Sequence, residues 1–357
     1  MKELLAIISY GLGHLKDVPD TIDWQAIKDL SSKQGVSSIV WDAILKLYEQ
    51  GLLVDGRALD VKLKKQWIGS VFQNYERKYE DYRKAIGKLA GFYNQHGFRL
   101  MVLKGYGLSL NYPVPEHRPC GDIDIWAFGK YREADEAVSK ELGIAINRSH
   151  HHHTVFSFRG YSVENHYDFV NVHAHRSSAE IEMIFKELAL SDESFTMIDG
   201  EKVYLPSPDL HALFILRHTM SHFASTSMSL RQILDWAFFV EKHSASIHWD
   251  WLLEVLDRFR MMDFFRCLNA ICVEDLGFDP SIFPTGTVTS ALKERALADT
   301  LSPEFHESAP TARLPLLLFK YRRWRANNWK QRMCYKEGLL SSFITLGWSH
   351  VMGPGEE

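Results

Sequence analysis

Two aspartates two residues apart offer the clearest chemistry in this sequence. Asp122 and Asp124 alternate with Ile123 and Ile125, a pattern that predicts a β-strand. Because side chains alternate between the two faces of a strand, both carboxylates project to one side. Neighbouring carboxylates repel, and a divalent cation between them removes that repulsion. Taken alone, the pair favours a polar strand face in water, with a metal site as the alternative.

A second predicted strand carries a third carboxylate. The stretch 161–169 alternates so that Glu164 and His166 fall on one face. If this strand lies beside the strand of Asp122, Glu164 joins the aspartates in one patch. Three carboxylates from neighbouring strands can hold one or two Mg²⁺ ions.

A glycine turn precedes the aspartates. The apolar run 98–103 predicts a short strand that ends at Lys104 and Gly105. A proline-containing loop, 112–118, follows this turn and leads back to the strand of the aspartates. The order is therefore strand, glycine turn, short helix, loop and second strand.

These motifs together resemble the uncharacterised nucleotidyltransferases of the DNA polymerase beta-like superfamily, over roughly residues 20–260. The shared pattern consists of Leu103-Lys104-Gly105, the Tyr112–Arg118 loop, Gly121-Asp122-Ile123-Asp124, Glu164-Asn165-His166, the histidine-rich segment Leu216–His222, and Leu230-Arg231 to Asp235. Each motif alone is common, and their joint order is specific.

The resemblance implies transfer of a nucleoside monophosphate (NMP) from a nucleoside triphosphate (NTP) to an unknown acceptor, which is a small molecule, peptide or protein. Asp122, Asp124 and Glu164 would be the catalytic Mg²⁺ ligands, and Glu164 would hold a second ion or take the proton of the acceptor hydroxyl. The residues expected to contact the nucleotide are Lys104, Gly105, Arg118 and Gly121. Lys104 and Arg118 would neutralise phosphate charge, while backbone N–H groups at Gly105 would face the triphosphate.

One position departs from the wider superfamily. The usual Gly-Ser pair, whose serine holds the terminal phosphates, is here Gly105-Tyr106. This departure leaves the grip on the triphosphate open and keeps a second hypothesis in view: a non-catalytic binding or regulatory protein with the same fold. A third hypothesis is a nucleotidyltransferase that acts on nucleic acid, based on the basic, aromatic stretch 320–332.

Composition bounds these hypotheses. The chain has 357 residues, 46% hydrophobic and 24% charged, with a formal net charge of -4. This charge disfavours, without excluding, a nucleic-acid partner. The four cysteines lack metal-site spacing, and no apolar run is long enough to span a bilayer. We therefore expect a cytoplasmic protein with reduced thiols.

The predicted elements describe an α+β protein, with a nucleotidyltransferase core sheet flanked by helical regions. We expect an N-terminal helical region (1–97), the core (98–206), a helical bundle (207–275) and a C-terminal helical and loop extension (276–357). Apolar residues of the stretch 59–95 form one stripe with gaps of three and four, which predicts helix packing against the core.

Histidines recur outside the carboxylate motifs. The run His150–His153 predicts a solvent-exposed strand entry, because neighbouring strand residues face opposite ways and make a poor metal site. His218 and His222 share a helical face, which is compatible with metal binding but favours an interface role. Arg231 and Asp235, four residues apart, are expected to pair along their helix.

Overall fold

A computed structural model describes residues 2–173, 175–284, 286–307, 309–310 and 313–337. Among these residues the strands form one six-stranded mixed sheet in the order β3-β4-β2-β1-β6-β5. Their bounds are β1 (Met101–Val102), β2 (Ile123–Trp126), β3 (His153–Phe158), β4 (Tyr161–His166), β5 (Phe195–Ile198) and β6 (Glu201–Tyr204). β2 runs parallel to β4 and antiparallel to β1, so the two strands with candidate ligands are neighbours.

The alternation within β2 divides its side chains between two differently packed faces of the sheet. Ile123 and Ile125 are fully buried and join a hydrophobic cluster with α5 (Arg77–Gln95) and α7 (Tyr131–Leu142). Asp124 points to the opposite face, where the helical part of the protein lies. The sheet therefore anchors the carboxylates by burying the other side of the same strand.

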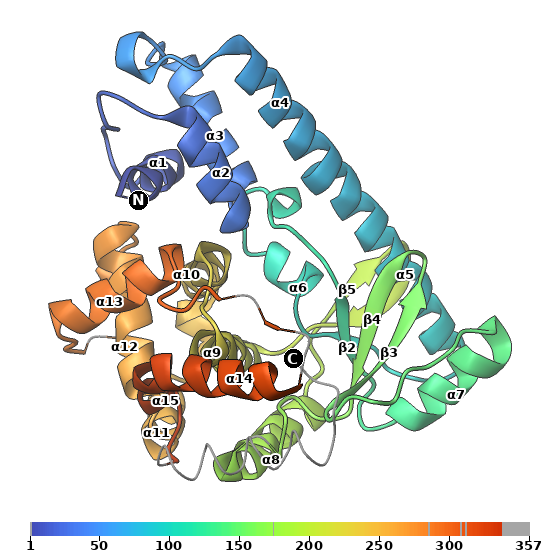
Figure 1. Cartoon of the computed structure of the whole chain (residues 1–357). Helices are drawn as coiled ribbons and strands as arrows, with labels where there is room; N and C mark the ends of the chain where they lie inside the picture. Colours follow the sequence, from blue (N-terminus) through green and yellow to red (C-terminus); the bar gives the residue numbers. More distant parts are fainter. Residues whose placement is uncertain (1, 174, 285, 308, 311–312, 338–357) are drawn as a thin grey trace.

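A long helical rod connects the N-terminal helices to the sheet. Figure 1 shows α4 (Val61–Val71) and α5 running on from one another, with a π-helical turn at Phe72–Glu76 between them. Trp67 and Val71 of the predicted stripe pack into the larger helical core, whereas Tyr82 and Ile86 pack on the sheet. The prediction that this stripe packs against the core is confirmed.

The remaining helices build a body beside the sheet (Figure 1). The N-terminal helices are α1 (Lys2–Leu12), α2 (Trp24–Lys33) and α3 (Ser37–Glu49), and one-turn α6 (Tyr106–Ser109) and α8 (Arg176–Leu190) lie within the core segment. Those after the sheet are α9 (Pro208–Ser225), α10 (Leu230–His243), α11 (Trp249–Arg258), α12 (Met262–Ala270), α13 (Ser290–Leu301), α14 (Arg313–Ala326) and α15 (Asn328–Cys334). One hydrophobic cluster unites the N-terminal helices with α9–α12. Helices and a mixed sheet confirm the α+β class.

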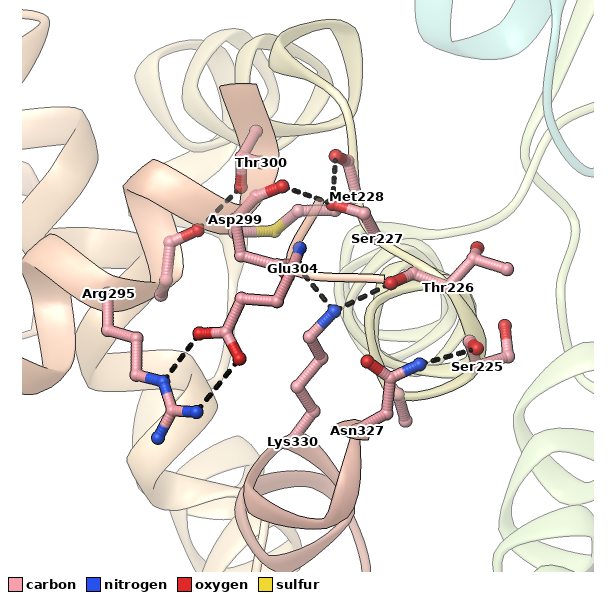
Figure 2. Close-up of polar contacts among 12 residues, drawn as sticks. Ser225, Thr226, Ser227, Met228, Arg295, Asp299, Thr300, Glu304, Asn327 and Lys330 are labelled. Atoms are coloured by element: carbon pink, nitrogen blue, oxygen red, sulfur yellow. Dashed lines mark hydrogen bonds and ion pairs between the residues drawn. The ribbon is translucent and has the colours of Figure 1, made fainter. Parts of the chain in front are cut away.

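The end of α9 is fastened by α15 (Figure 2). Asn327 donates to the carbonyl of Ser225 at 2.9 Å. Gln331 donates to the carbonyl of Ala224 at 3.1 Å. Lys330, which is fully buried, donates to the carbonyl of Thr226 at 2.6 Å. The last carbonyls of a helix lack partners within it, so these side chains complete α9. 

The residues of the basic stretch 320–332 are thus only partly exposed to solvent. Lys330 is buried, and the ring centroids of Trp329 and Phe223 are 5.4 Å apart. Tyr321 and Arg322, in contrast, are exposed. Residues 338–357 of the predicted C-terminal extension lie outside the described residues. Within the described part of the chain, no helix combines the length and the apolar character needed to cross a membrane.

Candidate active site

The candidate ligands meet where β2 and β4 run side by side. The parallel register sets Asp124 opposite Glu164 and Ile123 opposite Val163. Residues opposite one another in a sheet project to the same face, so both carboxylates point away from the α5 side. The strand of Glu164 therefore lies beside the strand of the aspartates, which was the condition for Glu164 to join them.

Asp124 is the centre of a small polar cluster. Its Oδ1 atom lies 2.6 Å from Lys104 Nζ and 3.3 Å from His166 Nε2. The same His166 nitrogen is 3.5 Å from Glu164 Oε2. Burial raises the pKa of Asp124, but the Lys104 charge and His166 outweigh burial and hold this pKa below its ordinary value. Asp124 is therefore an anion that two neighbours already stabilise.

Asp122 stands immediately before β2 and is exposed to solvent. Partial burial raises the pKa of Asp122, and the nearby charges of Glu164 and Asp124 raise it further. This mutual repulsion is what a bound cation would relieve. Asp124, Glu164 and His166 each offer a ligand atom, all within 4.8 Å of one another. The donor set thus fits a divalent cation.

A comparison with known families agrees with this geometry. The profile of a family described as uncharacterised nucleotidyltransferase matches residues 20–277, which include the sheet and α9–α12. The chain belongs to this nucleotidyltransferase family. No curated protein and no solved structure matches the chain. The expected family resemblance is confirmed, and it covers the whole cluster around Asp124.

The glycine turn holds the carboxylate strand in place. Gly105 has a φ of 57°, a backbone conformation that side chains with a Cβ rarely adopt. A Cβ here would lie 2.1 Å from the Tyr82 hydroxyl, which donates to the carbonyl of Asp122 at 2.9 Å. Gly105 therefore leaves room for a tyrosine of α5 to reach the backbone of the candidate site.

Replacement of Gly105 by alanine is expected to lower the free energy of unfolding by about 3 kcal/mol, from strained backbone and overpacking against Tyr82. Chemical denaturation measures this loss. Gly143→Ala is the matched control, because Gly143 also has a positive φ of 66° but no atom within 4 Å of an added Cβ. A loss no larger than that of the control would contradict the role assigned to the Tyr82 contact.

Tyr106, at the position of the usual serine, turns away from the carboxylates. It is buried, and its ring stacks on that of Tyr79 with centroids 6.1 Å apart. It therefore adds to the core between α5 and α6. The helix that follows Gly105 is a single turn of four residues.

Arg118 has a different position from the one expected for a phosphate ligand. Its buried guanidinium forms two bonds with Asp235, Nε to Oδ1 at 2.7 Å and Nη2 to Oδ2 at 2.9 Å. Its Nη1 donates to the carbonyl of Gly105 at 3.2 Å. The charge of Arg118 is thus already balanced, and the residue ties the glycine turn to α10. Both carboxylate oxygens of Asp235 thus bind Arg118. The expected partner was Arg231, on the same helix as Asp235.

Gly121 is exposed, and an added Cβ there would meet no atom within 4 Å. The chain around Gly121 therefore does not itself require a glycine. Open space next to Asp122 is compatible with the close approach of a ligand.

For two histidines of α9, the sequence favoured an interface role over metal binding. The Nε2 atoms of His218 and His222 lie 3.1 Å apart. Desolvation by the surrounding protein and the Lys104 charge lower the pKa of both rings, although His218 is only half-buried and His222 is exposed at the surface. At neutral pH the pair is thus uncharged, and one ring donates to the other. Their electrostatic coupling to Lys104 and Asp124 places them on the helical side of the cluster.

The histidine run contradicts its prediction as an exposed strand entry. His153 is buried and is the first residue of β3, while His152 is half-buried in the bend before it. The rule that neighbouring strand residues face opposite ways fails here because His152 precedes the strand. Both rings contact His166, with ring centroids 5.4 and 5.1 Å away. His166 itself was noted in the sequence only as part of a motif, without a chemical role.

Proposed function

We propose that this chain is a Mg²⁺-dependent nucleotidyltransferase that transfers an NMP group from an NTP to a small molecule, peptide or protein. The observation that carries the proposal is the register that sets Asp124 opposite Glu164, two residues after Asp122. Lys104 adds a positive charge at 2.6 Å from Asp124. Acidic ligands beside a cationic side chain suit a metal–triphosphate substrate.

Asp122, Asp124 and Glu164 would hold the metal. When bound, Mg²⁺ would neutralise charge that develops on the phosphate oxygens. Asp122 is exposed, and the Glu164 side chain is 24% exposed, so substrate can approach both. Asp124 is buried and held between Lys104 and His166, which fixes its orientation.

The reaction would join the acceptor oxygen to the α-phosphorus and break the bond from that phosphorus to the bridging oxygen, releasing pyrophosphate. Glu164 is the candidate to accept the proton of the acceptor hydroxyl, since it lies beside Asp124 and reaches solvent. Lys104 is the candidate to contact the leaving phosphates, by exchanging its bond with Asp124 for phosphate oxygens. 

The helical side of the site would complete the contacts with the nucleotide. The His218 and His222 rings, neutral at pH 7, can donate hydrogen bonds to phosphate without adding charge. The open space at Gly121 would admit the substrate next to Asp122. Arg118 acts as a positioning residue for the Gly105 turn.

The test uses parallel incubations with NTP labelled at the α- or the γ-phosphate, Mg²⁺ and a desalted cell extract as the source of acceptors. We expect covalent label from the α-position only, with γ-label recovered in pyrophosphate. Glu164→Gln, which keeps the shape of the side chain and removes its charge, should abolish the labelling.

Transfer of γ-label would instead identify a phosphotransferase and overturn the proposal. Absence of label with ATP, GTP, CTP and UTP would favour the non-catalytic binding protein that shares this fold. The two results differ, because only the first shows a covalent product.

A further inference from the structure

Three imidazole rings converge at the end of the sheet, next to the carboxylates. His152, His153 and His166 each offer a nitrogen, and these three nitrogens lie within 4.8 Å of one another. His153 and His166 are buried, and His152 is half-buried. The fold thus brings three metal-binding nitrogens together in a largely buried place.

We infer that His152, His153 and His166 form a binding site for one divalent transition-metal ion of the Zn²⁺ type, beside the carboxylates that would hold Mg²⁺. Imidazole is a preferred ligand of Zn²⁺ and a poor one for Mg²⁺, which takes oxygen ligands. Three protein ligands leave the fourth tetrahedral position for water.

The spacing of the rings agrees with such a site. Their centroids are 4.4 Å apart for His152 and His153, 5.4 Å for His152 and His166, and 5.1 Å for His153 and His166. With metal–nitrogen distances of about 2.0–2.1 Å, tetrahedral angles separate imidazole centroids by about 5 Å. The rings therefore need little movement to meet one ion.

Backbone hydrogen bonds hold the three residues in this arrangement. His153 pairs directly with His166 across the β3–β4 hairpin. The carbonyl of His152 accepts from the backbone N–H groups of Tyr167 and Asp168, at 3.0 and 3.1 Å. These bonds fix the bend before β3 against the end of β4. The site is thus preorganised by two segments of the chain, since His153 and His166 are 13 residues apart in the sequence.

A contact with the backbone orients the His166 ring as a metal ligand. Its Nδ1 lies 3.2 Å from the carbonyl of Asp168, which can accept the ring proton. Nε2, which lies 3.3 Å from Asp124 Oδ1, would then coordinate the ion in place of its contact with that carboxylate. Ligand histidines in metal sites are commonly oriented in this way. The ring of His150 stacks on that of His153, with centroids 4.6 Å apart.

Metal binding by the full chain can be measured without nucleotide, in competition with a chromogenic chelator, so failure of this site is distinguishable from failure of the transferase proposal. We expect one Zn²⁺ per chain, not displaced by millimolar Mg²⁺. His153→Ala and His166→Ala should each weaken binding by about a hundredfold or more, since changes even beyond the ligands weaken sites by 10–100-fold. His151→Ala, the matched control within the run, should change it less than about threefold.

His166→Ala separates a folded site from a linear histidine run, because it leaves all of His150–His153 in place. Tight binding by this variant would overturn the proposal, as would a wild-type chain that binds no Zn²⁺. Far-ultraviolet circular dichroism checks that the variants fold.

A second measurement gives a positive signal. The His152→Cys variant loaded with Co²⁺ should gain a sulfur-to-metal charge-transfer band in the near ultraviolet, whereas His151→Cys should not. A band in both variants, or in neither, would contradict the assignment of His152 as a ligand.

Discussion

Replacement of Asp122 by alanine is expected to lower the rate of nucleotidyl transfer by about a thousandfold or more, and to leave the fold intact. Removal of a metal ligand forfeits several kcal/mol of transition-state stabilisation, and ~4 kcal/mol corresponds to a factor of a thousand. Asp122 is exposed, and its carboxylate is repelled by Glu164 and Asp124. Without metal, the variant should therefore be as stable as the wild type or slightly more stable.

The label-transfer assay and a thermal melt of the same preparations measure both effects. Glu136→Ala is the matched control, because Glu136 is an exposed carboxylate of α7 outside the cluster. Its activity should equal that of the wild type. If Asp122→Ala retained full activity, Asp122 would not be a catalytic ligand; if it failed to fold, the surface position assigned to it would be wrong.

Replacement of Lys330 by methionine should lower the free energy of unfolding by about 3–5 kcal/mol, the range observed when one partner of a buried ion pair is removed. Lys330 Nζ lies 2.6 Å from Asp299 Oδ2, and both side chains are fully buried. The variant leaves the Asp299 charge without this cation and the Thr226 carbonyl without its donor (Figure 2). Urea denaturation followed by circular dichroism gives the size of the loss.

A double variant separates charge from packing. Asp299 Oδ1 also accepts from the backbone N–H of Glu304 at 2.9 Å, a bond that asparagine can keep. Lys330→Met combined with Asp299→Asn removes the uncompensated charge and should recover a large part of the stability. A single variant within about 1 kcal/mol of the wild type would show that the pair contributes little.

Local patterns predicted the parts of the site that depend on one strand or one turn. The alternation around Asp124 and Glu164 determines which face each side chain takes, and the parallel pairing of β2 with β4 then brings them together. The hairpin of β3 and β4 also depends on a local signal, the turn at Arg159 and Gly160, and both residues have the positive φ of such turns. 

Features that depend on distant partners were not predictable in this way. Asp235 was expected to pair with Arg231, yet it binds Arg118, which is 117 residues away. The edge strand β5 was missed, although the Asp199-Gly200 turn that follows it is a common hairpin signal. His152 was treated as a strand residue, but it lies in the bend before β3, and its ring contacts that of His166.

The central claim is that Asp122, Asp124 and Glu164 bind a metal–nucleotide complex. The most direct test is a thermal melt with ATP, GTP, CTP and UTP, each with and without Mg²⁺, for the wild type and Asp122→Ala. We predict that one nucleotide raises the melting temperature by a few degrees, because ligand at a hundred times its dissociation constant adds about 2.7 kcal/mol of stability. The increase should require Mg²⁺ and vanish in the variant. An increase that persists in Asp122→Ala, or that needs no metal, would contradict the claim.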